Sequence, residues 1–106
     1  MYYPLSALLM ECIILSIVND QDSYGYEISR SIKKIASIKE STLYPILKKL
    51  ELGGLVSTYA EEHNGRNRKY YKISESGRSQ LNVLTEHWIS YRDEIDKLVL
   101  GGNKND

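Results

Sequence analysis

Cysteine is almost absent from this sequence, because Cys12 is the single one among 106 residues. A lone cysteine cannot form an intrachain disulfide. Cys12 lies among apolar residues, so we expect a buried, reduced thiol rather than a reactive one. This usage fits the reducing cytoplasm, where we expect the protein to reside.

The side chains that build most catalytic sites are also scarce. There are two histidines: His63 falls in an expected turn and His87 stands beside Trp88. Neither a glycine-rich phosphate loop nor a nucleophile elbow is present, and no catalytic triad or metal cage can be assembled from these residues. The sequence therefore predicts that the protein is not an enzyme and uses no metal or cofactor.

A membrane-spanning run is missing as well. The apolar segment at residues 8–18 is interrupted by Glu11 and is shorter than the roughly 17 to 25 residues that cross a bilayer. It has neither a basic flank nor a small-residue cleavage site. We expect neither a signal peptide nor a membrane anchor.

The chain has no net charge, with 14 basic and 14 acidic side chains, but the charges are unevenly distributed. Residues 33–72 hold four acidic residues against nine basic ones, namely Lys33, Lys34, Lys39, Lys48, Lys49, Arg66, Arg68, Lys69 and Lys72. The rest of the chain then holds 5 basic and 10 acidic residues. Such asymmetry is the electrostatic footprint of a nucleic-acid-binding surface, although solvated basic faces are also common.

Two amphipathic helices are predicted in the first third of the chain. The first ends near Asn19 and Asp20, and its core face is formed by Leu5, Leu8, Leu9, Cys12, Ile13, Ser16 and Ile17. Asp22 or Ser23 is placed to cap the second, whose core face is formed by Tyr24, Ile28, Ile32 and Ile35. Gly25 indicates either close helix packing or a frayed first turn.

A third helix is predicted from about Glu40 to Leu52, with Gly53 and Gly54 as its C-terminal stop and Leu43, Leu47 and Leu50 on its core face. Its other face suits contacts with DNA phosphates and base edges, with a solvated face as the alternative. The candidates on this face and at its start are Lys39, Ser41, Thr42, Tyr44, Pro45 and Lys48. Pro45 predicts a distortion or a later helix start.

A β-hairpin follows the glycines. Residues 55–60 and 69–73 have the composition of strands, and residues 61–68 join them with an Asn64-Gly65 turn signal. Arg66, Arg68 and Lys69 cluster at the turn, where long cations can reach DNA phosphates. Charge for solubility alone is the other interpretation.

Ser74 is expected to cap a long last helix with a heptad seam at Leu81, Leu84, Trp88, Tyr91, Ile95 and Leu98. A domain of this size buries only about 60 to 68% of its unfolded surface, and no other helix is left to cover the seam. We therefore expect a homodimer held by this helix and by the N-terminal helix at Leu8. In a symmetric dimer, Trp88 approaches its symmetry mate.

Together these elements predict a mainly α fold with a small antiparallel β-hairpin. We interpret residues 1–74 as a winged helix-turn-helix domain, residues 75–100 as a dimerisation helix and residues 101–106 as a disordered tail. The expected partner is double-stranded DNA carrying an inverted repeat. A winged helix used only for protein interaction is the alternative, and the basic residues of the third helix and hairpin argue against it.

With these residues assembled, the chain resembles the PadR family of transcriptional regulators over roughly residues 5–98. The resemblance rests on YGYEI at 24–28, STLYPILKKLE at 41–51, GLV at 54–56, RKYY at 68–71 and SESG at 74–77. It implies a homodimeric repressor that binds an inverted repeat and is released by a small effector, often phenolic or planar. Lys39 departs from the pattern, since a small capping residue would better start the recognition helix.

The tryptophan adds a more specific resemblance. Compact members of the family that resemble multidrug sensors carry a tryptophan at the position of Trp88, which implies stacking of flat aromatic ligands. The expected effector site is then formed by Leu84, His87, Trp88 and Tyr91. An aromatic residue that only packs in the seam is the alternative.

Overall fold

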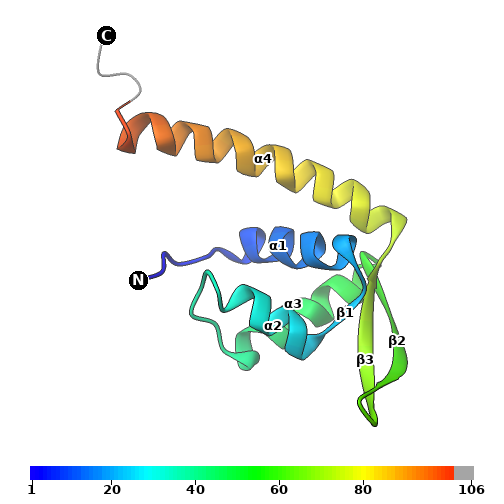
Figure 1. Ribbon diagram of the computed structural model, residues 1–106. Helices are drawn as coiled ribbons and strands as arrows, with labels where there is room; N and C mark the ends of the chain where they lie inside the picture. The colour runs from blue at the N-terminus through cyan, green and yellow to red at the C-terminus, as the bar shows by residue number, and fades with distance from the viewer. Residues whose placement is uncertain (102–106) are drawn as a thin grey trace.

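The computed structural model describes residues 1–101, which form four helices and three short strands. The helices are α1 (Ala7–Asp20), α2 (Gly25–Ile32), α3 (Glu40–Leu52) and α4 (Glu75–Val99), and the strands are β1 (Ser23–Tyr24), β2 (Val56–His63) and β3 (Arg66–Ile73). In Figure 1, α1 to α3 form a compact group, the β2–β3 hairpin projects from one side, and α4 runs along α1 and extends away from the rest. This arrangement confirms the predicted winged-helix fold with a long C-terminal helix. Apart from Gly101, the predicted tail lies outside the described residues.

The core face of α1 differs from the predicted one. Its buried apolar side chains are Met10, Ile14, Leu15 and Val18. Leu8 is 53% exposed, and Cys12 is half-buried rather than buried. The reason is that α1 is covered on one side by α2 and α3 and on another by α4, so it lacks the single apolar stripe of a surface helix.

The second helix begins later than the predicted caps allow. Ser23 and Tyr24 form a short strand instead, and α2 starts at Gly25 with Tyr24 in the N-cap position. The Ser23 hydroxyl donates a hydrogen bond to the Glu27 carboxylate at 2.9 Å. Ile35 is 50% exposed and does not belong to the core, because the helix has already ended at Ile32.

The third helix has the predicted bounds, and Pro45 neither delays its start nor interrupts it. Its C-terminal stop is also confirmed. Gly54 has a φ of +75°, its N–H donates to the carbonyl of Glu51 at 3.0 Å, and the N–H of Leu55 donates to the carbonyl of Leu50 at 3.0 Å. This pair of bonds satisfies carbonyls that the end of the helix leaves free.

The sheet has the order β1-β3-β2 and is antiparallel. The predicted eight-residue connection at 61–68 is wrong, because β2 and β3 continue to a two-residue turn. Asn64 and Gly65 have φ angles of 54° and 78°, as a type I′ turn requires, and this turn joins two twisted strands directly. We refer to the β2–β3 hairpin as the wing.

Helix α4 begins where it was predicted, at the Ser74 cap. The Ser74 hydroxyl accepts a hydrogen bond from the N–H of Gly77 at 3.0 Å and donates one to the carbonyl of Gly54 at 2.6 Å. The first part of the heptad seam, Leu81 and Leu84, is buried in the chain's own core. The later part, from Trp88 to Leu98, is exposed. Among residues 1–101, none of the helices combines the length and apolar character that a bilayer crossing needs.

Candidate nucleic-acid interface

The nine predicted DNA-contacting residues belong to α3 with its N-cap and to β3 of the wing. Lys39 occupies the N-cap position of α3 with an extended backbone, and its side chain makes no capping hydrogen bond. Five others lie exposed along α3, namely Ser41, Thr42, Tyr44, Pro45 and Lys48. The remaining three, Arg66, Arg68 and Lys69, lie on β3 of the wing.

A groove of about 410 Å³ brings part of this set together. Tyr44 from α3 faces Arg68 and Lys69 from the wing across it, and the other lining residues are Tyr24, Gly25, Tyr26, Asn67 and Tyr71. The rest of the predicted set does not line this groove. Lys39 and Thr42 line a separate groove of about 440 Å³ with the N-terminal residues Tyr2 and Tyr3.

Gly25 at the start of α2 allows Tyr44 to lie close to the backbone. A Cβ atom added to Gly25 would lie 2.8 Å from both Cε1 and the hydroxyl oxygen of Tyr44, closer than carbon atoms normally pack. Of the two interpretations of Gly25, the close-packing one is therefore correct. The Tyr44 side chain remains 45% exposed along this contact.

The guanidinium group of Arg68 packs on an aromatic ring. Its guanidinium carbon lies 4.6 Å from the centre of the Tyr24 ring, and its Nε is buried without a hydrogen-bond partner among the described residues. The Tyr24 ring packs edge-on against Tyr70 at 5.3 Å, and Tyr70 stacks on Tyr59 at 5.5 Å. The aromatic layer Tyr24–Tyr70–Tyr59 thus continues from the arginine toward the base of the wing.

Lys69 has a different environment from the two arginines. Its ammonium donates a hydrogen bond to Oε1 of Glu51 at 3.2 Å, and Oε2 of Glu51 accepts one from the Thr58 hydroxyl at 3.1 Å. The hydrogen bond from Lys69 and then that from Thr58 lower the pKa of Glu51, and the same bond to Glu51 raises the pKa of Lys69. Sequence reasoning missed the role of Glu51, because nothing in the local pattern distinguishes it from other solvated glutamates.

The other face of the wing carries a similar bond. The Tyr59 hydroxyl donates to the carboxylate of Asp22 at 2.6 Å. This hydrogen bond is the main reason that the pKa of Tyr59 rises from 10 to about 12. Asp22 was considered only as a helix cap, so this contact was also missed.

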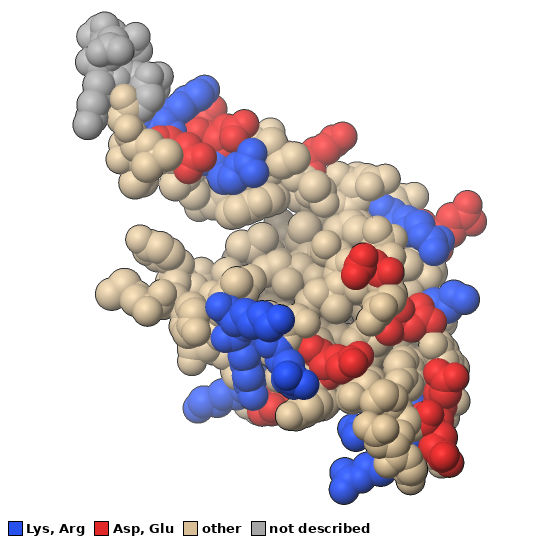
Figure 2. All heavy atoms as spheres, in the orientation of Figure 1, with Lys and Arg blue, Asp and Glu red and all other residues tan. Residues whose placement is uncertain are grey.

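Ion pairs occupy three of the nine basic residues between positions 33 and 72. Lys33 pairs with Glu40 at 3.2 Å, Lys49 with Glu11 at 2.9 Å and Lys69 with Glu51 at 3.2 Å. The other six, Lys34, Lys39, Lys48, Arg66, Arg68 and Lys72, form no ion pair within residues 1–101. In Figure 2, blue atoms lie on the side of the wing toward the helices, whereas red atoms follow its outer edge.

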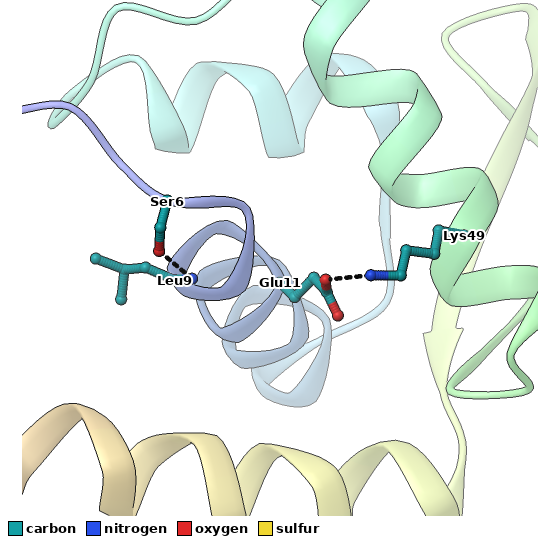
Figure 3. A network of polar contacts seen from close by, with 4 residues as sticks. All are labelled: Ser6, Leu9, Glu11 and Lys49. Carbon is teal, nitrogen blue, oxygen red and sulfur yellow. Dashed lines mark hydrogen bonds and ion pairs between the residues drawn. The ribbon is translucent and has the colours of Figure 1, made fainter.

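The Glu11–Lys49 ion pair connects α1 with α3 (Figure 3). Glu11 is only 8% exposed, although it is charged and its neighbours in α1 are mostly apolar. Figure 3 also shows the start of α1, where the Ser6 hydroxyl accepts a hydrogen bond from the N–H of Leu9 at 3.1 Å. The charge that interrupts the apolar segment at residues 8–18 therefore fixes α1 to α3.

A third groove, of about 380 Å³, lies between α4 and the start of α1. All four residues predicted for an effector line it, namely Leu84, His87, Trp88 and Tyr91. The opposite wall is formed by Pro4, Ser6, Leu8, Leu9 and Cys12. Spacings of three and four residues along α4 thus place the predicted residues on one surface, next to α1.

Comparisons with known proteins agree with this architecture. The model of the transcriptional regulator PadR-like family matches residues 14–83. The crystal structure of smu.1704 from Streptococcus mutans UA159 has 61% sequence identity, covers 95% of each chain and gives a TM-score of 0.91. A transcriptional regulator from Clostridium thermocellum has 35% identity over 87% of this chain and 94% of its own, with a TM-score of 0.76.

A curated relative is similar over a comparable length. The transcriptional regulator Rv3488 of Mycobacterium tuberculosis is 29% identical over 93 residues, which are 87% of this chain and 83% of the relative. The family match extends from the middle of α1 to the early part of α4, and so includes α3 and the wing. The chain belongs to the PadR-like family, whose members are transcriptional regulators and not enzymes.

Proposed function

We propose that the protein is a homodimeric repressor that binds an inverted repeat in double-stranded DNA. The observation that carries this proposal is the groove in which Tyr44 of α3 faces Arg68 of the wing. In a winged helix, the recognition helix enters the major groove and the wing contacts the flanking backbone. An exposed polar helix face beside arginines that form no ion pair within residues 1–101 has the chemistry for both contacts.

The two elements have different tasks in this proposal. Ser41, Thr42 and Tyr44 contact base edges or orient α3 in the major groove of DNA, whereas Arg66 and Arg68 neutralise phosphates. Replacing both arginines by alanine should weaken binding to all sequences alike and lower the salt slope by about one unit per lost phosphate contact. Changes at Ser41, Thr42 or Tyr44 should instead alter the preference between sites. Equal effects of both sets on random and selected DNA would refute this division.

The decisive experiment is selection of bound sequences from random duplex DNA. A twofold dimer presents two equivalent recognition helices to successive major grooves, so the recovered sites should be inverted repeats with half-sites about 34 Å or 10 base pairs apart. A salt-dependent gel shift with random duplex DNA is the first control. Absence of any DNA binding would leave the fold as a protein-interaction module and reject the proposal.

The dimer in this proposal is formed by residues 75–100, attached to the winged-helix domain of residues 1–74. Support comes from the later part of the seam, where Trp88 is 36% and Leu98 83% exposed. Ultracentrifugation should show a dimer, and the double variant Ile95→Glu plus Leu98→Glu should sediment as a folded monomer. Asn82→Glu plus Ile89→Glu, which add the same two charges at exposed positions on the outward face of α4, are the matched control. A wild-type monomer at micromolar concentration would contradict the proposal.

Release from DNA is assigned to a flat aromatic or phenolic effector in the groove lined by Trp88. Its volume of about 380 Å³ lies within the range of small-molecule sites. Binding lowers DNA affinity only if the ligand prefers an arrangement of the two α4 helices that does not fit the operator. Planar dyes and phenolic acids should quench Trp88 fluorescence and release operator DNA, and Trp88→Ala should reduce the release. If no compound does both, this groove is not the effector site.

A further inference from the structure

Two carboxylates outside the wing, those of Glu51 and Asp22, accept hydrogen bonds from its opposite faces. Thr58 and Tyr59 are neighbours in β2, so their side chains point to opposite sides of the ribbon. The Thr58 hydroxyl donates to Glu51 at 3.1 Å and the Tyr59 hydroxyl to Asp22 at 2.6 Å. One side of the ribbon is therefore bound to α3, and the other to the connection between α1 and β1.

On the first face, a single carboxylate contacts both strands of the wing. Glu51 lies in the last turn of the recognition helix, and its second oxygen accepts the hydrogen bond of Lys69 at 3.2 Å. Thr58 pairs across the ribbon with Tyr71, two residues from Lys69 on β3, so Thr58 and Lys69 are diagonal neighbours on one face. Lys69 thus forms an ion pair with α3, whereas Arg66 forms no ion pair within residues 1–101.

On the second face, Asp22 holds the end of an aromatic layer. Tyr59 stacks on Tyr70, and Tyr70 packs against Tyr24, over which Arg68 lies at 4.6 Å. Displacement of Tyr59 would therefore disturb the position of the Arg68 guanidinium through the contacts of Tyr70 and Tyr24.

The direction of the outer half of the wing depends on how its base is held, because the outer half is a two-stranded ribbon. Strand β1 pairs with Tyr70 and Tyr71, and within residues 1–101 the ribbon beyond them has no third strand. An isolated two-stranded hairpin is marginally stable in water. Backbone pairing with β1 and β2 fixes the register of β3, and the side-chain bonds of Thr58 and Tyr59 add contacts to the helices from both faces of the same base.

We propose that Glu51 and Asp22 form a two-sided clamp that sets the angle between the wing and the recognition helix, and that both act as positioning residues for DNA binding. The inference rests on the proposed DNA-binding function. Both residues carry negative charge near a surface that meets phosphates, so by charge alone each one opposes binding. A positioning role and a charge effect therefore predict opposite signs, which makes the proposal testable.

The test compares Glu51→Ala and Asp22→Ala with Glu62→Ala in the full chain. Each variant removes one negative charge, and Glu62 is an exposed wing residue without a hydrogen bond or ion pair from its side chain within residues 1–101. The two clamp variants should bind selected operator DNA roughly tenfold more weakly or worse, because a hydrogen bond to a charged group contributes at least about as much as a tenfold change in affinity. Glu62→Ala should bind as tightly as the wild type or more tightly. Clamp variants that also bind equally or more tightly would overturn the proposal.

A milder pair of variants excludes loss of folding as the cause. Tyr59→Phe and Thr58→Val remove only the hydroxyls and no charge, and each should weaken binding while thermal unfolding stays cooperative. The double variant Asp22→Ala plus Tyr59→Phe should bind no more weakly than the worse single variant, because both remove the same bond. Additive losses would overturn the clamp. A wild type that shows no salt-dependent DNA binding would reject the underlying function instead, so the two failures are distinguishable.

Discussion

Replacing Gly25 by alanine should separate DNA binding from stability. The new Cβ would lie 2.8 Å from Cε1 of Tyr44, whereas carbon atoms pack at about 3.5 to 4.0 Å, so the ring must retreat by about 1 Å. The atoms that the methyl group meets are the far end of a half-exposed side chain. The ring should therefore rotate away from α2, while the two helices stay in place.

The stability change is small because two effects oppose each other. Alanine is more favourable than glycine inside a helix by about 0.5 to 1 kcal/mol, and less so at its first position. The displaced tyrosine loses part of its packing against α2, so the free energy of unfolding should stay within about 1 kcal/mol of the wild type. Operator affinity should fall by about tenfold, since a displaced Tyr44 hydroxyl loses one hydrogen bond worth about 1.4 kcal/mol.

Thermal unfolding and fluorescence anisotropy with operator DNA measure the two quantities. Gly77→Ala is the matched control, because its Cβ would collide with the carbonyl oxygen of Leu55 and lie 2.7 Å from Cγ1 of the buried Ile73. These atoms cannot move aside, so the control should lose about 2 kcal/mol of stability and roughly 4 to 8 °C of Tm for each kcal/mol. If Gly25→Ala folds normally and binds the operator with unchanged affinity, the reasoning about Tyr44 is wrong.

Three further outcomes follow from single contacts. The hydrogen bond to Asp22 raises the pKa of Tyr59 in the folded state from 10 to about 12. The bond should therefore stabilise the fold below pH 10, and this stabilisation should be lost as the pH rises through about 12. The free energies of unfolding of the wild type and Tyr59→Phe should converge at that pH. Ser74→Ala should cost about 0.5 to 2 kcal/mol in chemical denaturation through loss of the α4 cap, whereas the exposed Ser79→Ala should change little. Gly54→Ala meets no atom within 4 Å but has a φ of +75°, so a loss of about 1 kcal/mol should come from backbone strain alone, and no loss would contradict this account.

The features predicted correctly from the sequence have local causes. The bounds of α3 and its stop at Gly54 depend on neighbouring residues, as do the Ser74 cap and the Asn64-Gly65 turn position. The four α4 residues predicted together also line one groove, because spacings of three and four residues place them on one helix face.

The features that were missed depend on contacts distant in sequence. Strand β1 has two residues and exists only because Tyr24 pairs with Tyr70. The buried face of α1 depends on α4, which lies at the other end of the chain. Asp22 and Glu51 gain their hydrogen-bond partners only when the wing has folded onto the helices. The choice between the two interpretations of Gly25 also needed the structure, because its close contact with Tyr44 depends on how α2 packs against α3.

The two-residue turn at the tip restricts how the length of this protein's wing can change. Side chains alternate between the two faces of a strand, so inserting one residue into each strand beyond Arg68 would send Arg66 to the opposite face. Two residues per strand would restore its face and lengthen the wing by about 6.8 Å, at about 3.4 Å per residue. Wings of this type can therefore extend along DNA only in discrete steps of four inserted residues, if the arginine is to keep its orientation and the tip its tight turn.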